Sequence, residues 1–406
     1  MTEIKPQQDF DIVINGGGMV GAALACGLVR EGFSVAVIDR QIPPPFDAEA
    51  LPSLRVSALG HSTVGFLQTI GIWSQIKQWR CAAYRKLKTW ESPSASAEFT
   101  AEQLGLPELG YMVENDILQR ALWEQLQQLG VQIYCPQRLQ QMQRQPDGWL
   151  LSLDNQHSLR CRMVVGADGA NSQVRQLASI GVSGWDYAQH CMLISVRCEN
   201  APGDMTWQQF TPQGPRAFLP LYGPYASLVW YDSPARITYL KTLSKVQLAQ
   251  AIAIHFPAQT GAVEVLERGS FALRRQHVSH YVQPGLALVG DAAHTINPLA
   301  GQGVNLGYRD IETLITVLAE RKQIGQPWWQ LDCLKAYQRQ RWLDNHLMQA
   351  GMDLFYFSFS NDHLPLKIVR NLALMAAERS GVLKQKALSY ALGIESSLTG
   401  AMGERG

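Results

Sequence analysis

The sequence lacks the features of a secreted, disulfide-bonded or metal-binding protein. Its 7 cysteines are an odd number, and no two of them form a C-x-x-C pair, so we expect neither a disulfide framework nor a zinc site. The first ten residues are polar and contain no apolar signal-peptide segment. We therefore predict no metal, buried reduced cysteines and a cytoplasmic location.

Net charge is nearly absent as well. The 35 Lys+Arg against 34 Asp+Glu leave a formal net charge of +1, which provides no field to attract nucleic acid. Hydrophobic residues make up 46% and charged residues only 17%, which is apolar for a soluble protein. No uninterrupted apolar run approaches the roughly 20 residues that a membrane-spanning helix needs. We expect a soluble, neutral protein of two or three structural units.

The order of patterns predicts an α/β fold with an insertion. Residues 10–39 read as strand, glycine turn, helix and strand, which is a βαβ unit. Helical patterns cover about 57–80 and 115–129, and a hairpin is expected around residues 146–148. From about 185 the pattern changes to alternating, aromatic-rich segments typical of an antiparallel sheet. The predicted units are a Rossmann-like domain in two parts (1–184 and 281–330), the inserted sheet (185–280), a C-terminal helical region (331–394) and a disordered tail (395–406).

A glycine-rich turn follows the first predicted strand. Gly16, Gly18 and Gly21 form G-x-G-x-x-G at the start of a helix. The first glycine permits a tight turn, the second lets the backbone approach a pyrophosphate, and the third allows close helix–strand packing. Asp39 follows the second strand, where its carboxylate can accept hydrogen bonds from an adenosine ribose. This unit predicts dinucleotide binding; a glycine turn that serves packing alone is the alternative.

A second motif follows another buried strand. Asp168 and Gly169 lie in the segment VVGADGANSQVR, residues 164–175. An Asp-Gly pair after a strand is ordinary tight-turn chemistry, and Asn171 or Ser172 can cap the helix that follows. Taken alone, this motif favours neither a structural turn nor a binding site.

A third motif combines an acid, a histidine and a second helix opened by glycine. Gly290 and Asp291 follow a buried strand, His294 comes soon after, and PLAGQGVN occupies residues 298–305. We expect a helix to start near Gly301, with free backbone N–H groups that favour an anion. For a dinucleotide held by the first motif, its redox-active half is the natural recipient.

The three motifs, in this order, resemble the FAD-dependent aromatic hydroxylases related to para-hydroxybenzoate hydroxylase, over about residues 9–320. Residues 294–310 are similar to the signature of the ubiquinone-biosynthesis hydroxylases within that family. The resemblance implies that the glycine turn holds the FAD phosphates, Asp39 the ribose, Asp291 the ribityl chain, and the backbone near Gly301 the isoalloxazine. It names as FAD-contacting residues Gly16, Gly18, Gly21, Asp39, Arg55, Gln119, Asp168, Gly169, Gly290, Asp291, Gly301, Gln302, Gly303, Val304 and Asn305.

Two of these positions depart from the family pattern. Gln119 stands where an arginine is usual, and Asp39 replaces the commoner glutamate with a shorter side chain. The exact contact that Gln119 makes is therefore open.

The resemblance also implies the reaction. NAD(P)H would reduce FAD, O2 would give a flavin hydroperoxide, and the electron-rich ring of a polyprenyl benzoquinol of the demethoxyubiquinol type would be hydroxylated. Since quinol hydroxyls already activate the ring, no acid–base pair is required, and the catalytic residues stay unknown with Pro298 and His294 as candidates. For His294, a hydrogen bond that orders its loop is the favoured interpretation. Only one complete G-x-G-x-x-G is present, so NAD(P)H is expected to bind transiently.

The substrate pocket is expected on the inserted sheet. Its aromatic and apolar residues suit a quinol with a long tail, although ordinary alternation on a packed sheet is the favoured explanation for any single one of them. The candidates are Trp207, Arg216, Phe218, Leu219, Tyr222 and Trp230.

Further alternatives concern partners and function class. The basic and apolar stretch 351–392 favours helices that cap the FAD domain, with peripheral contact to the inner membrane or to other ubiquinone-biosynthesis proteins as the alternative. Rival functions are hydroxylation of another ring position or phenol, an NAD-dependent dehydrogenase, and a non-enzymatic dinucleotide-binding redox sensor. The second and third motifs disfavour the dehydrogenase.

Overall fold

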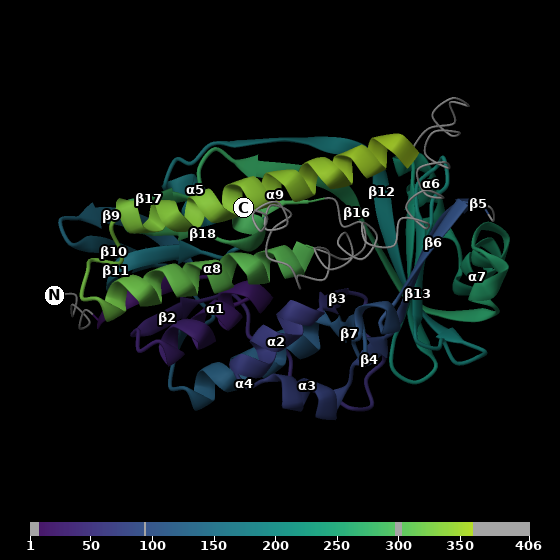
Figure 1. Cartoon of the computed structure of the whole chain (residues 1–406), viewed down its shortest axis with the longest axis horizontal. Helices are drawn as coiled ribbons and strands as arrows, with labels where there is room; N and C mark the ends of the chain where they lie inside the picture. Colours follow the sequence, from purple (N-terminus) through teal and green to yellow (C-terminus); the bar gives the residue numbers. More distant parts are fainter. Residues whose placement is uncertain (1–7, 93–94, 297–302, 360–406) are drawn as a thin grey trace, which may run out of the picture.

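The computed structural model describes residues 8–92, 95–296 and 303–359, which form an α/β fold around two large sheets and one small sheet (Figure 1). Most of the predicted C-terminal helical region, residues 360–394, and the predicted disordered tail, 395–406, lie outside the described residues. Within the described part no helix is long and apolar enough to cross a membrane.

The first sheet has eight strands and contains the predicted βαβ unit. Its central strand β1 pairs in parallel with β2 and with β11. Ile12, Val13 and Ile14 of β1 are fully buried, as expected for a parallel strand that is covered on both faces. The predicted hairpin is confirmed, because β9 and β10 pair antiparallel around the turn and extend the sheet from β11. The strands are β1 (Gln8–Asn15), β2 (Val35–Ile38), β8 (Gln132–Tyr134), β9 (Leu139–Gln145), β10 (Gly148–Leu153), β11 (Ser158–Gly166), β17 (Val282–Gln283) and β18 (Leu286–Leu288).

The register of this sheet brings the three motifs together. Asn15 at the end of β1 lies beside Gly166 at the end of β11, and Gly166 lies beside Leu288 at the end of β18. Since the strands are parallel, the segments that follow them emerge at one edge. Ligands of open α/β sheets bind at such carboxyl edges.

The second sheet is also eight-stranded, and its middle is antiparallel as predicted. Its order is β19-β16-β12-β15-β14-β13-β5-β6. The strands β5 and β6 come from a much earlier part of the chain than the predicted insertion, which the sequence pattern did not indicate. The strands are β5 (Lys86–Ser92), β6 (Ala95–Thr100), β12 (Val182–Cys198), β13 (Met205–Gln209), β14 (Arg216–Pro220), β15 (Tyr225–Asp232), β16 (Val263–Val278) and β19 (His294–Thr295).

The helical expectation for residues 57–80 is wrong in part. Val56–Gly60 forms strand β3 of a small sheet, paired with β7 (Gly110–Glu114), which also pairs with β4 (Ala82–Tyr84). Two separate helices then follow, α2 (His61–Thr69) and α3 (Trp73–Trp79). Gly71 between them has φ +89°, a left-handed conformation that interrupts a helix.

The remaining helices cover the sheets. α1 packs against α4 and α8, and α9 lies along α8. Figure 1 shows α7 on the far side of the second sheet from the small sheet. The helices are α1 (Met19–Arg30), α4 (Asn115–Gln128), α5 (Gln173–Leu177), α6 (Pro234–Thr242), α7 (Lys245–His255), α8 (Gly303–Gln323) and α9 (Leu331–Phe359).

Candidate functional site

The three glycines of the first motif have different surroundings. Gly16 has φ +110°, and a Cβ there would lie 2.4 Å from the carbonyl oxygen of Ala167. A Cβ on Gly21 would lie 1.9 Å from the carbonyl oxygen of Gly16. By contrast, a Cβ on Gly18 would meet no atom within 4 Å. Gly16 and Gly21 are thus required by packing, whereas Gly18 borders open space.

That open space lies at the N-terminus of α1. Gly18 is the N-cap residue, no side chain caps the helix, and no acidic residue occupies its first turn. The first backbone N–H groups of a helix have no partner within the helix, and together with the helix dipole they favour an anion. The geometry fits a diphosphate beside Gly18.

Asp39, which directly follows β2, and two side chains of α4 hold the glycine turn in place. Asp39 accepts hydrogen bonds from Gly17 N through Oδ2 (2.6 Å) and from Gln41 N through Oδ1 (3.0 Å). Gln119 Nε2 and Trp123 Nε1 both donate to the carbonyl oxygen of Gly17, at 3.0 and 2.6 Å. A carboxylate offers about four acceptor positions, so Asp39 retains capacity for ribose hydroxyls. The sequence reading missed Trp123, although its i, i+4 spacing from Gln119 places both on one face of α4.

The Asp-Gly motif lies on the neighbouring strand end. Asp168 Oδ2 accepts hydrogen bonds from Asn15 Nδ2 (2.8 Å) and from the backbone N atoms of Gln173 (2.7 Å) and Val174 (3.1 Å). Its other oxygen, Oδ1, is buried and has no partner. Gly169 has φ +80° and faces open space. A buried carboxylate oxygen without a donor is rare, and it fits a site completed by a bound group.

The third motif turns sharply after β18. Gly290 has φ +58°, and its N–H donates to Asp310 Oδ2 at 3.0 Å. The side chain of Asp291 has exposed surface, yet protein atoms surround its carboxyl closely. The resulting desolvation raises the pKa of the carboxyl, while the charges of His294 and Arg55 lower it. The exposed side chain of Arg55 is close enough to Asp291 for its charge to act on that carboxyl.

His294 is buried rather than open to a substrate. Its Nε2 lies 2.5 Å from Asp310 Oδ2, and its exposed fraction is 2%. This contact agrees with the loop-ordering interpretation. Pro298, the other catalytic candidate, lies outside the described residues, as do the proposed FAD-contacting residues Gly301 and Gln302.

The described part of the helix signature begins α8 at Gly303. Val304 is half-buried. The side chain of Asn305 is buried and bonds to Gly60 N (3.0 Å), Thr63 Oγ1 (2.8 Å) and Ala58 O (2.8 Å). Asn305 therefore fixes α8 to the β3–α2 connection, and a contact with FAD at this residue would use its backbone.

The six substrate candidates lie on opposite faces of the second sheet. Trp207, Phe218 and Trp230 pack in a cluster with apolar residues of α6 and α7. Arg216 is cross-strand from Trp230 and forms a buried ion pair with Asp232 at 3.0 Å. These four side chains lie in the core between the sheet and its covering helices. The six predicted substrate residues therefore do not line one common pocket.

Leu219 and Tyr222 belong to a different cluster. They pack with residues of the small sheet, including Ala58 and Met112, on the side of the FAD motifs. Adjacent strand residues point to opposite faces, which separates Leu219 from Phe218.

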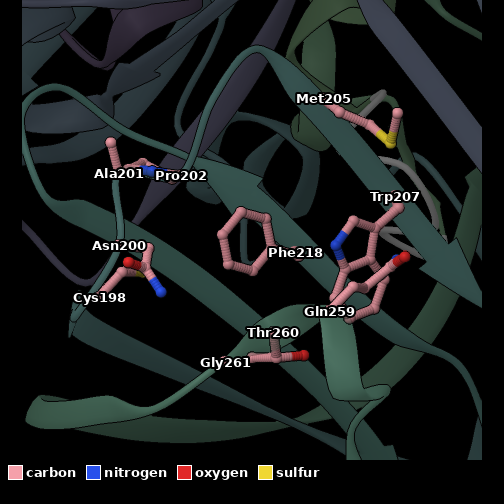
Figure 2. Close-up of a pocket in the computed structure, with 10 residues that line it drawn as sticks. All are labelled: Cys198, Asn200, Ala201, Pro202, Met205, Trp207, Phe218, Gln259, Thr260 and Gly261. Atoms are coloured by element: carbon pink, nitrogen blue, oxygen red, sulfur yellow. The ribbon is translucent and has the colours of Figure 1, made fainter.

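Trp207 and Phe218 do line a pocket, but a separate one (Figure 2). Its volume is about 190 Å³. Figure 2 shows the two rings side by side, and their planes stack at 11° with centroids 5.6 Å apart. No residue of the three motifs lines this pocket. In the ranges that the structure covers, no cluster of three or more His, Cys, Asp or Glu side chains could hold a metal ion.

A buried histidine on β16, paired with His294 of β19, makes the stability of the protein depend on pH. His277 is 4% exposed, and burial lowers its pKa from 6.5 to about 4. Between these values the unfolded chain binds a proton that the folded chain does not, so the free energy of unfolding falls as pH falls from 6.5 to 4. We expect His277 to contribute a loss of about 3 kcal/mol over this window. Denaturant unfolding at several pH values should show a flatter profile for His277→Gln than for wild type; equal profiles would exclude this assignment.

Comparison with known proteins decides the family. Residues 9–342 match the family model described as FAD binding domain. The chain belongs to this family. The 3-demethoxyubiquinol 3-hydroxylase of Escherichia coli (strain K12) is 55% identical over 388 residues, covering 95% of this chain and 99% of that protein. The ubiquinone hydroxylase UbiL of Rhodospirillum rubrum is 34% identical, covering 94% of this chain and 89% of that protein.

Solved structures of monooxygenases share the fold of this chain. The p-nitrophenol 4-monooxygenase PnpA from Pseudomonas putida DLL-E4 has a TM-score of 0.79 at 17% identity, covering 95% of this chain and 99% of that one. PqsL from Pseudomonas aeruginosa has a TM-score of 0.77 at 20% identity, covering 91% of this chain and 100% of that one. The predicted fold class is confirmed. With the family, the chain is an FAD-dependent monooxygenase.

The residues at the sheet edge fit this cofactor. The uncapped α1 and the open space beside Gly18 fit the diphosphate of FAD. The unpartnered oxygen of Asp168 fits a hydrogen bond from a hydroxyl group of the same ligand.

Proposed function

We propose that the chain hydroxylates the ring of a polyprenyl benzoquinol of the demethoxyubiquinol type in ubiquinone biosynthesis, with NAD(P)H and O2 as co-substrates. The observation that carries the proposal is the 55% identity over 95% of the chain with the E. coli enzyme of that activity. We assign FAD binding to residues 1–184 and 281–330, and the substrate face to the sheet within residues 185–280.

Bound FAD supplies the redox chemistry and the activation of oxygen, and the protein supplies binding and orientation. The N–H groups at the start of α1 hold the diphosphate, Asp39 accepts from the ribose hydroxyls, and Asp291 accepts from the ribityl hydroxyls. Gln119 and Trp123 act indirectly, because both hold the carbonyl oxygen of Gly17. The dipole of α8, which has no acidic residue in its first turn, favours negative charge on the isoalloxazine.

The substrate face is the side of the second sheet that carries Leu219. Leu219 and Tyr222 contribute to it from β14 and the turn after it, and half-buried Leu193 and Val229 lie opposite each other on β12 and β15. Their apolar surfaces suit a neutral ring with a polyprenyl tail. The opposite face of the sheet, which α6 and α7 cover, carries the other four candidates: Trp207, Arg216, Phe218 and Trp230.

Alanine substitutions at neighbouring positions separate the two faces. Leu219→Ala should raise the KM for the quinol several-fold with a modest loss of stability. Phe218→Ala should cost about 3–5 kcal/mol of unfolding free energy, since it empties a packed core position, and leave KM unchanged in the folded fraction. Steady-state kinetics and chemical denaturation measure both. A raised KM for Phe218→Ala with an unchanged KM for Leu219→Ala would place the quinol on the other face.

The reaction is tested with FAD-loaded protein and a short-tailed demethoxyubiquinol. We expect the quinol to accelerate NAD(P)H oxidation and the product to gain one oxygen atom from ¹⁸O2. A fully substituted ubiquinol of the same tail length is the control, because it has no free ring position. A product hydroxylated at another position would favour the alternative hydroxylase. A yellow protein that oxidises NAD(P)H no faster with any quinol would favour the redox sensor.

We also propose a cytoplasmic location with peripheral contact at the inner membrane, where a polyprenyl quinol resides. The stretch 351–392, which is basic and apolar, and other proteins of ubiquinone biosynthesis are the candidate contacts. Most of that stretch lies outside the described residues.

A further inference from the structure

One carboxylate beneath the third motif connects three parts of the chain. Asp310 lies on α8 and is fully buried. Its Oδ2 accepts hydrogen bonds from Gly290 N (3.0 Å) and from His294 Nε2 (2.5 Å). Its Oδ1 accepts hydrogen bonds from Arg341 Nε (2.8 Å) and Asn345 Nδ2 (3.1 Å) on α9. One oxygen of Asp310 therefore binds the turn that contains Gly290 and His294, and the other binds α9.

The two groups bound by Oδ2 flank Asp291. Gly290 precedes Asp291 directly, and its positive φ sets the direction of the turn. His294 follows at the start of β19. Because one oxygen fixes the backbone before Asp291 and the side chain after it, the intervening residues have little freedom to change path.

The carboxylate is held in its charged form. Burial opposes the charge, but His294 and Arg341 outweigh it and keep the pKa of Asp310 below its usual range. An ionised carboxylate accepts hydrogen bonds only, so His294 donates from Nε2. Hydrogen bonds to a charged acceptor are shorter and stronger than neutral ones, and leaving a buried charge without them is costly. The turn is therefore firmly tied to α8.

We propose that Asp310, acting with His294, is a positioning residue for FAD: it fixes the Gly290–His294 turn so that the Asp291 carboxylate is presented to the cofactor before the cofactor binds. The role concerns the cofactor site and rests on the family's FAD binding, not on the identity of the quinol. His294 takes part through its Nε2–H, and no proton transfer to substrate is assigned to it.

The test compares FAD affinity with stability in four full-length variants. Deflavinated protein is titrated with FAD by fluorescence, and the unfolding midpoint is measured without FAD. His294→Ala and Asp310→Asn should each weaken FAD binding about tenfold or more, the effect of losing a hydrogen bond to a charged group. His294→Gln should stay near wild type, because its amide can donate to the same oxygen.

Asn345→Ala is the matched control. It removes a hydrogen bond to the other oxygen of Asp310, so the midpoint should fall while the FAD dissociation constant stays near that of wild type. Wild-type affinity in His294→Ala would overturn the proposal. So would a loss of affinity in Asn345→Ala as large as that in His294→Ala at the same loss of stability, because the network would then be merely structural. The titration contains no quinol, so a failure of the proposed substrate would not alter its reading.

Discussion

Gly18→Val is expected to abolish FAD retention while leaving the protein folded. Gly18 has φ −68°, which any residue can adopt, and a Cβ there meets no atom of the protein within 4 Å. The valine side chain would occupy the space beside the first turn of α1, where we place the diphosphate. The cost in stability should be about 1 kcal/mol, because glycine is preferred to valine at an N-cap, and this loss is too small to unfold the protein.

The measurement is the ratio of flavin to protein absorbance after purification, together with the unfolding midpoint of the flavin-free protein. Gly21→Ala provides the contrast, because its Cβ would lie 1.9 Å from the carbonyl oxygen of Gly16 and should destabilise the fold itself. Normal FAD content in Gly18→Val would refute the placement of the diphosphate.

Arg216→Ala is expected to destabilise the protein by about 3–5 kcal/mol, because it leaves a buried carboxylate unpaired. Arg216 is 4% exposed and pairs with Asp232, itself 8% exposed, at 3.0 Å. Its guanidinium also donates to backbone carbonyl oxygens, including that of Gly214, and lies 4.8 Å from the ring centroid of Trp230. Burial lowers the pKa of Arg216 to about 10 despite Asp232, so the guanidinium is still charged at neutral pH.

Arg197→Ala is the matched control on the same sheet. Arg197 pairs with Glu264 at 3.8 Å, and both side chains are about half exposed or more. An exposed pair contributes at most about 1 kcal/mol, so chemical denaturation should show a small effect. If Arg216→Ala kept wild-type stability and raised the KM for the quinol instead, the substrate role inferred from the sequence would be correct.

The cofactor motifs were predictable because their signals are local. Gly16, Gly18 and Gly21 stand in one turn between a buried strand and a helix, and the parallel register then brings that turn beside Asp168 and Gly290. The hairpin at β9 and β10 was predictable for the same reason, since a short turn fixes its pairing.

The faces of the second sheet were not predictable from local pattern. Alternation separates Phe218 from Leu219, but it does not tell which face α6 and α7 will cover. The aromatic residues, read as a substrate pocket, lie mostly on the covered face because large rings fill the space between a sheet and its helices.

Long-range pairing set the other limit. The strands β5 and β6 join the second sheet from a distant part of the chain, with β5 paired in parallel to β13. Likewise, Asp310 meets Gly290, His294 and Arg341 only once α8 and α9 are packed together. No spacing rule in the sequence links these residues, so their shared role emerges from the structure alone.

Hydroxylation of a demethoxyubiquinol-type ring by this protein is tested most directly by mass spectrometry of the quinones that accumulate in cells lacking it. We expect accumulation of the demethoxy-quinone, which lacks the ring oxygen that this hydroxylation adds, and restoration of ubiquinone by the wild-type chain but not by Gly18→Val. Accumulation of an earlier intermediate, or an unchanged quinone pool, would contradict it.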